Sequence, residues 1–210
     1  MLQSISISPQ ATGITPTGLL VALHGWGANA QDLASLVPLL KLPTYQFIFL
    51  EAPFPHPAVA DGRAWYDLNK PGAEGLVESR ELLQAYLQDL PQQTGIALDK
   101  TILMGFSQGG AMTMDVGLGL PLAGLVVLSG YLHPFAQQLP DRKPPTLLVH
   151  GKYDQVVPIV AAQSAQKTLT KQGVDLEYEE YEMGHEITLP VIDRVREFIA
   201  DISDLAGAGE

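Results

Sequence analysis

Short apolar segments of strand length recur along this chain, and they constrain its fold more than any other feature. Most are continuous runs of valine, isoleucine and leucine rather than alternating apolar and polar residues. A strand in the middle of a parallel sheet needs such a run, because both of its faces contact apolar neighbours. Five segments are expected to be buried strands of this kind: Leu19–Leu23, Tyr45–Leu50, Thr101–Met104, Leu125–Leu128 and Thr146–Val149.

Two further segments alternate in polarity and suit less buried strands. Asp175–Tyr181 alternates apolar and acidic residues, which is typical of a strand nearer the edge of a sheet. Ile5 and Ile7 indicate a short edge strand at the start of the chain.

Helical patterns lie between the strand-like segments. Asn29 is a good N-cap, with the acidic Asp32 three residues later. The alternation predicts one α/β domain over residues 1–210, with a mostly parallel central sheet, helices on both faces and ligands beyond the carboxyl ends of the strands. The expected helices are Asp32–Leu40, Glu78–Leu90, Gln108–Leu118, Ala161–Lys171 and Val191–Ile202.

Composition excludes several classes of function. The chain has no cysteine, which rules out a disulfide, a thiol nucleophile and a cysteine-ligated metal. Its net charge of −11 repels polyanions, so no nucleic-acid partner is expected. No apolar run approaches the ~20 residues of a membrane-spanning helix. The N-terminus MLQSISISPQ lacks the pattern of a secretory signal, so a cytoplasmic location is expected.

The segment TILMGFSQGGAM carries the strongest chemical signal. It places Ser107 between Gly105 and Gly109 as G-x-S-x-G, directly after a buried strand and before a helical pattern. A sharp strand-to-helix turn needs small neighbours, because larger side chains would collide there, and it holds the serine hydroxyl above the sheet. The context predicts that Ser107 is a nucleophile at the N-terminus of a helix.

A serine hydroxyl needs a general base, and the chain contains five histidines. His185, in EMGHEI, follows a strand and precedes the last helix, which makes it the expected base. We expect structural roles for the other four, and His24 in particular is expected to brace a loop through hydrogen bonds. These four are His24, His56, His133 and His150.

The acid of the predicted triad is expected between the serine and the histidine in the chain. Asp154, in VHGKYDQVVP, begins a loop after a strand and is expected to orient the imidazole. Asp141, in a loop before a strand begins, and Asp175, at the start of a strand, are competitors that are expected to be surface charges facing away from the active end.

Two aligned N–H donors are needed to stabilise a tetrahedral oxyanion. The backbone N–H of Gln108, directly after the nucleophile, is expected to be one of them. The other is expected from Trp26 in LLVALHGWGAN, the loop after an early strand. The alternative is that this segment is only a glycine turn between a strand and a helix.

Taken together, LHGWG, AWYDL, GFSQGGA, GKYDQVVP and GHEI resemble the carboxylesterase/phospholipase branch of the α/β-hydrolases, which includes the acyl-protein thioesterases. The resemblance runs from Leu23 to about Ile187. It implies the α/β-hydrolase fold, no cofactor and no metal, and hydrolysis of acyl esters or thioesters. Three features differ from the thioesterases: Trp26 stands where they usually carry leucine, the chain is somewhat shorter, and Asp115 is a charge in a helix position that is often uncharged.

The sequence therefore predicts a serine carboxylesterase for short to medium acyl chains, working through an acyl-enzyme. Its partner is expected to be a small acyl ester or thioester, and the chain is expected to be a monomer or homodimer. Four loop residues are expected to line the acyl pocket: Phe54, Trp65, Leu68 and Met183. The alternatives are an acyl-protein thioesterase or lysophospholipase, a transferase or perhydrolase with the same triad, and a catalytically silent binding module.

Overall fold

The computed structural model describes residues 2–11, 13–134 and 139–207, with side chains in the last helix as far as residue 203. Its centre is a seven-stranded sheet in the order β1-β3-β2-β6-β7-β8-β9. All neighbours pair in parallel except β1, which lies antiparallel to β3 at one edge. The strands are β1 (Ser4–Ile7), β2 (Gly18–Leu23), β3 (Tyr45–Leu50), β6 (Thr101–Phe106), β7 (Gly124–Leu128), β8 (Thr146–Gly151) and β9 (Leu176–Tyr181).

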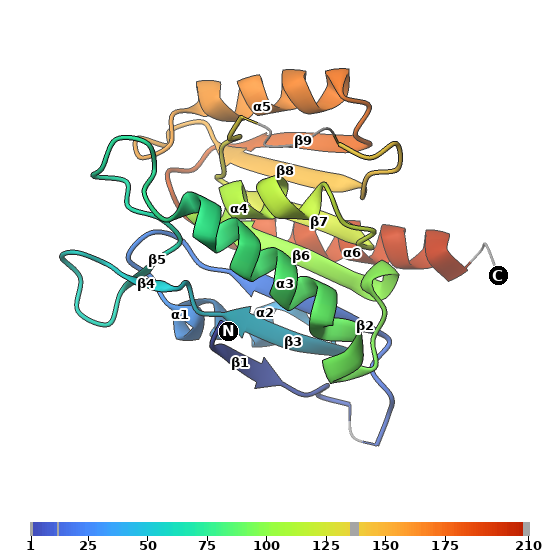
Figure 1. Ribbon diagram of the computed structural model, residues 1–210. Coiled ribbons are helices and arrows are strands. Elements are labelled where there is room, and N and C mark those ends of the chain that lie inside the picture. Colours follow the sequence, from blue (N-terminus) through green and yellow to red (C-terminus); the bar gives the residue numbers. More distant parts are fainter. Residues whose placement is uncertain (1, 12, 135–138, 208–210) are drawn as a thin grey trace.

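Helices cover both faces of the sheet, as Figure 1 shows for α3 and α4 in front of it and α6 behind it. One face packs against α3, α4 and α5, and the other against α1, α2 and α6. Every residue of β2, β7 and β8 is buried, which is what their continuous apolar runs predicted. The helices are α1 (Ala30–Ala34), α2 (Val37–Leu40), α3 (Leu76–Thr94), α4 (Gln108–Gly117), α5 (Ile159–Lys171) and α6 (Leu189–Gly207).

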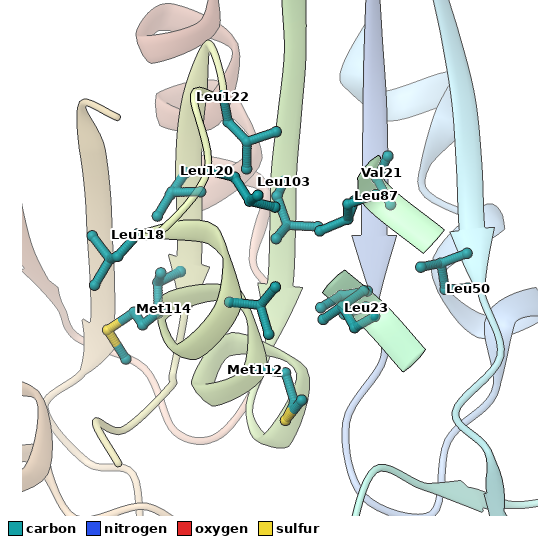
Figure 2. Close-up of a cluster of buried hydrophobic side chains, with 14 of the residues drawn as sticks. Val21, Leu23, Leu50, Leu87, Leu103, Met112, Met114, Leu118, Leu120 and Leu122 are labelled. Carbon is teal, nitrogen blue, oxygen red and sulfur yellow. The ribbon is translucent and has the colours of Figure 1, made fainter. Parts of the chain in front are cut away.

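The sheet has a hydrophobic core on each of its two faces, and successive residues of a strand point alternately into one core and the other. In β2, Val21 and Leu23 point to the core beneath α3 and α4, whereas Leu20 and Ala22 belong to the opposite core. Figure 2 shows Val21 and Leu23 beside Leu87, with Met112 nearby on α4. Helix α4, which begins directly after Ser107, is thus buried along most of its length, which fixes its first residues relative to the sheet.

Residues 30–40 form two short helices where one helix was predicted. Pro38 has no N–H to donate to the carbonyl of Ala34, and its ring would clash there, so the helix ends before it. The predicted N-cap is present: Asn29 Oδ1 accepts from the backbone N–H groups of Gln31 and Asp32 at 3.0 and 3.2 Å. The carboxylate of Asp32 accepts from the Asn29 N–H at 2.9 Å, which completes a capping box.

A two-stranded hairpin, β4 (Phe54–Pro55) with β5 (Arg63–Ala64), lies between β3 and α3, where no strand was predicted. Arg63 anchors it, since its guanidinium donates to the carbonyls of Ala52 and Pro53 at 2.9 and 2.8 Å. Among the described residues, no helix combines the length and the apolar character that crossing a bilayer requires.

Candidate active site

Ser107 occupies the single position between the end of β6 and the start of α4. Its backbone angles are φ 56° and ψ −117°, a conformation that is strained for any residue with a side chain. Its N–H donates to the carbonyl of Leu128 on the neighbouring strand at 2.8 Å, and its carbonyl accepts from Ala111 of α4 at 3.0 Å. The turn is therefore held by hydrogen bonds to both the sheet and the helix.

The two glycines of the G-x-S-x-G motif are required by close backbone contacts. A Cβ atom on Gly105 would lie 2.2 Å from the carbonyl oxygen of Gly109, and one on Gly109 would lie 2.2 Å from that of Leu23. Both separations are far inside van der Waals contact. The helix can approach the sheet this closely only with glycine at both positions, and that approach keeps Ser107 at the sheet edge.

His185 and Asp154 come from loops at the carboxyl ends of two neighbouring parallel strands. Asp154 follows β8, and His185 lies between β9 and α6. Nε2 of His185 lies 2.9 Å from Ser107 Oγ, and Nδ1 lies 2.7 Å from Asp154 Oδ2. With Nδ1–H donating to the carboxylate, Nε2 is free to accept the serine proton, so the chemistry of an acid–base–nucleophile chain is available.

Asp154 is held as a carboxylate by its surroundings. Burial acts to raise its pKa, but hydrogen bonds from His185 and from the backbone N–H groups of Val157 and Val156 outweigh it, so the pKa lies below its ordinary value. The two backbone N–H groups reach Oδ1 at 2.8 and 2.9 Å, which leaves Oδ2 for the imidazole. The competitors Asp141 and Asp175 are exposed and precede β8 and β9, at the opposite ends of these strands.

The other histidines make local structural contacts. His24 is buried; its Nδ1–H donates to the Gly25 carbonyl at 2.8 Å, and its Nε2 accepts from the Ala52 N–H at 3.1 Å. Burial is the main reason that its pKa is lowered, which favours this neutral form. His56 Nδ1 accepts from the backbone of the hairpin loop, and His150 donates to a carbonyl in the loop that carries Asp154.

The predicted oxyanion donors lie at the N-terminus of α4 and in the loop after β2. Both ends of the Gln108 side-chain amide form hydrogen bonds within the protein: its Oε1 accepts from the Trp65 N–H at 2.9 Å, and its Nε2 donates to the Tyr66 carbonyl at 2.8 Å. Within the described part of the chain, no protein group accepts from the backbone N–H of Gln108 or Trp26. Both N–H groups are available to a ligand.

Two cavities adjoin this region. The first, of about 230 Å³, is lined by Trp26 and Phe54 together with charged residues in the loop before α3 and with Glu78 in its first turn. The second, of about 330 Å³, has His185 and Phe106 in its wall, with Leu33, Leu36 and Ile187. The two cavities are separate, because no residue lines both.

Of the four residues expected in the acyl pocket, only Phe54 lines one of these two cavities. Trp65 is fully buried, and its indole N–H donates to the His24 carbonyl at 3.0 Å, so it packs beneath the loops rather than facing a cavity. Met183 is also buried, in the core that contacts α6, and Leu68 is half exposed. The physical reason is that a buried indole N–H needs a partner, which the β2 loop supplies.

Asp115, for which the sequence offered no role, lies at the centre of a second polar cluster. Its carboxylate forms a two-point ion pair with Arg80 of α3, at 2.5 and 3.1 Å, and accepts from His133 Nδ1 at 3.1 Å. His133 Nε2 in turn lies 2.9 Å from the Tyr66 hydroxyl, which contacts the Tyr131 hydroxyl. No local pattern announces the cluster, because its members come from four separate segments.

A sequence model of the phospholipase/carboxylesterase family matches residues 9–203 of the chain. This chain belongs to that family. Two relatives carry the name acyl-protein thioesterase 1: that of Neurospora crassa is 30% identical over 88% of this chain and 86% of its own, and that of Gibberella zeae 29% identical over 87% and 89%. The crystal structure of esterase PE8 superposes with a TM-score of 0.87 at 30% identity, covering 96% of this chain and 99% of that one.

These findings confirm the fold class and the family branch predicted from the motifs. This member of the phospholipase/carboxylesterase family has the α/β-hydrolase fold and is a carboxylesterase-type serine hydrolase that acts on esters or thioesters. In the described residues no three histidine, aspartate or glutamate side chains are grouped as metal ligands would be.

Proposed function

We propose that Ser107, His185 and Asp154 form the catalytic triad of a carboxylesterase that cleaves short to medium acyl esters, with residues 1–210 acting as one catalytic domain. The observation that carries the proposal is the continuous hydrogen-bonded chain from Ser107 Oγ through His185 to Asp154, at 2.9 and 2.7 Å. The strained backbone of Ser107 supports it, since such strain persists where function requires it.

Hydrolysis follows in two steps. The Oγ of Ser107 attacks the ester carbonyl while His185 Nε2 takes its proton, and the backbone N–H groups of Trp26 and Gln108 stabilise the oxyanion. His185 then gives the proton to the departing alcohol. Water, activated by the same histidine, releases the acid from the acyl-enzyme.

The first cavity is the acyl site in this proposal. Trp26 contributes both an oxyanion N–H and part of the cavity wall, and Phe54 lies on that wall as well. An acyl chain in this cavity therefore starts beside the oxyanion donors. Each methylene that becomes buried is worth about 0.8 kcal/mol, or roughly a fourfold gain in kcat/KM.

A thioester substrate is the second candidate, favoured by the relatives named acyl-protein thioesterase 1. The same serine, base and oxyanion donors serve both chemistries. Rates on matched p-nitrophenyl esters and acyl-thioesters of one chain length distinguish the two preferences.

Ser107→Ala is the direct test. It should abolish labelling by a fluorophosphonate probe and hydrolysis of p-nitrophenyl butyrate, while the circular dichroism spectrum and melting temperature stay near those of the wild type. Ser129→Ala is the matched control: Ser129 is buried, also has a positive φ of 49°, and follows the neighbouring strand β7, yet no described side chain hydrogen-bonds its hydroxyl. Its substitution should leave labelling intact.

A p-nitrophenyl ester series of graded acyl length then tests the acyl site. The rise from acetyl toward medium chains should flatten in Phe54→Ala and persist in Leu68→Ala, which alters a half-exposed residue outside both cavities. Labelling that remains in Ser107→Ala would refute the triad. A chain-length profile that Phe54→Ala leaves unchanged would instead refute the acyl site alone.

A further inference from the structure

The second cavity differs from the first in having His185 itself in the wall. The imidazole packs against Phe106, with the ring centroids 4.8 Å apart, and its Nε2 faces Ser107 Oγ. Leu33 of α1, Leu36 at the start of α2 and Ile187 form an apolar part of the wall. The rest comes from the loop after β2 and from two carboxylate side chains, namely His24, Gly25, Ala28, Asp32 and Glu186. The cavity thus borders the imidazole that faces Ser107.

The direction of proton transfer decides which part of an ester this cavity faces. When the tetrahedral intermediate collapses, the bond between the carbonyl carbon and the alcohol oxygen breaks, and His185 Nε2–H supplies the proton to that oxygen. The alcohol oxygen must therefore lie within hydrogen-bond reach of Nε2. The group attached to it extends along the histidine side, whereas the oxyanion and the acyl group occupy the other two positions around the carbonyl carbon.

We propose that the second cavity is the leaving-group site of this enzyme and that it selects esters of neutral, apolar alcohols. The proposal rests on the triad proposed above. The acyl group is transferred to Ser107 Oγ, the alcohol leaves carrying the proton that His185 took from the serine, and water later regenerates the free serine. Its volume of about 330 Å³ suits a ring or a short alkyl chain, since a dry cavity of about 150 Å³ already holds benzene.

The charges around the cavity argue against anionic leaving groups. Asp32 and Glu186 are exposed carboxylates in its lining, and none of the residues that line it is a lysine or an arginine. The Asp32 carboxylate is fixed in place by the capping box at Asn29. A phosphate- or carboxylate-bearing alcohol would meet repulsion with no compensating cation, and the net charge of −11 adds to that effect.

Acetate esters with one acyl group and different alcohols test the proposal. Methyl, butyl, benzyl and 4-carboxybenzyl acetate release alcohols of similar acidity, so differences in kcat/KM report on binding of the alcohol part. The wild type should prefer butyl and benzyl over methyl acetate, by about fourfold for each methylene buried. It should disfavour 4-carboxybenzyl acetate relative to benzyl acetate by tenfold or more.

Leu36→Lys places a cation in the cavity wall and should raise the ratio of 4-carboxybenzyl to benzyl acetate turnover at least fivefold. Leu39→Lys is the matched control on the same short helix, because Leu39 is 41% exposed and does not line the cavity, so the wild-type ratio should persist. Ile187→Lys repeats the test from another lining residue should Leu36→Lys fail to fold.

Fluorophosphonate labelling of Ser107 and hydrolysis of p-nitrophenyl acetate separate this proposal from the triad. If both persist while benzyl and methyl acetate react equally, or while both lysine variants keep the wild-type ratio, the leaving-group site is refuted and the triad stands. A wild-type enzyme that the probe does not label at Ser107 would refute the triad.

Discussion

Two chains of hydrogen bonds in this molecule have the same order of groups, an aspartate, a histidine and a hydroxyl. In one, Asp154 Oδ2 lies 2.7 Å from His185 Nδ1, and Nε2 lies 2.9 Å from Ser107 Oγ. In the other, Asp115 Oδ2 lies 3.1 Å from His133 Nδ1, and Nε2 lies 2.9 Å from the Tyr66 hydroxyl. By distance alone, the second chain is nearly as good a triad as the first.

The two chains differ in what compensates the carboxylate charge. Asp115 has a permanent cation, since Arg80 binds it at two points. Asp154 receives two backbone N–H groups on its other oxygen instead, and no arginine or lysine among the described residues forms an ion pair with it. A carboxylate that an arginine already neutralises stabilises a neighbouring imidazolium less, whereas Asp154 keeps its full charge for His185.

The hydroxyl groups differ as well. Tyr66 is buried, and burial raises the pKa of its phenol above the ordinary value, with the adjacent Tyr131 adding to the effect. Its oxygen faces the Tyr131 hydroxyl rather than a cavity. Ser107 stands at the edge of the sheet, directly before the free N–H group of Gln108, and its partner His185 lines a cavity. The comparison teaches that access and countercharge, more than the order of groups, separate a chain suited to chemistry from one suited to holding elements together.

Asparagine substitutions should separate the two chains most widely. Asp154→Asn should lower kcat by about 10⁴-fold, because the amide favours the wrong imidazole tautomer and does not stabilise the imidazolium. Asp115→Asn should keep kcat within tenfold of the wild type. It should instead lower the free energy of unfolding by about 2–3 kcal/mol, near the low end for a broken buried pair because Arg80 is partly exposed.

Steady-state kinetics on p-nitrophenyl butyrate and urea denaturation of both variants measure these effects. An Asp154→Asn enzyme with wild-type kcat would end the assignment of Asp154. A 10³-fold loss of kcat in Asp115→Asn, without a loss of stability, would show that the second chain also takes part in the reaction.

The strands of the sheet were predicted well because a strand that is buried on both faces consists of a continuous run of apolar residues. Gly124–Leu128 is apolar throughout and is buried throughout, so its range was found to within one residue. The hairpin of Phe54–Pro55 and Arg63–Ala64 was missed because strands of two residues have no measurable period. The break at Pro38 was likewise not predicted, because the spacing of the apolar residues on both sides of it fits a single helix.

In the candidate site, too, some residues could be placed from the sequence and others could not. Residues at the ends of parallel strands were brought together as expected, since the topology forces those ends to one edge of the sheet. Side chains in the long loops were harder to place, and Trp65 shows why: its position follows from a hydrogen bond to His24, 41 residues away, which no local pattern records. The ion pair of Arg80 with Asp115 is a contact of the same long-range kind.

The smallest expected effect is on the pH dependence of the free energy of unfolding, compared between the wild type and Asp154→Asn. Because the pKa of Asp154 in the folded protein lies below its ordinary value of 3.8, the unfolded chain takes up that proton first as the pH falls. The stability contributed by Asp154 is therefore fully present above about pH 5, and it is lost as the pH falls through the folded-state value. Asp154→Asn should thus lose less unfolding free energy between about pH 5 and pH 3 than the wild type.

Asp141→Asn, which removes an exposed carboxylate, controls for the loss of one charge. Urea unfolding at stepped pH measures the slopes, and equal slopes for Asp154→Asn and the wild type would show that the hydrogen bonds from His185, Val157 and Val156 do not favour the ionised carboxylate.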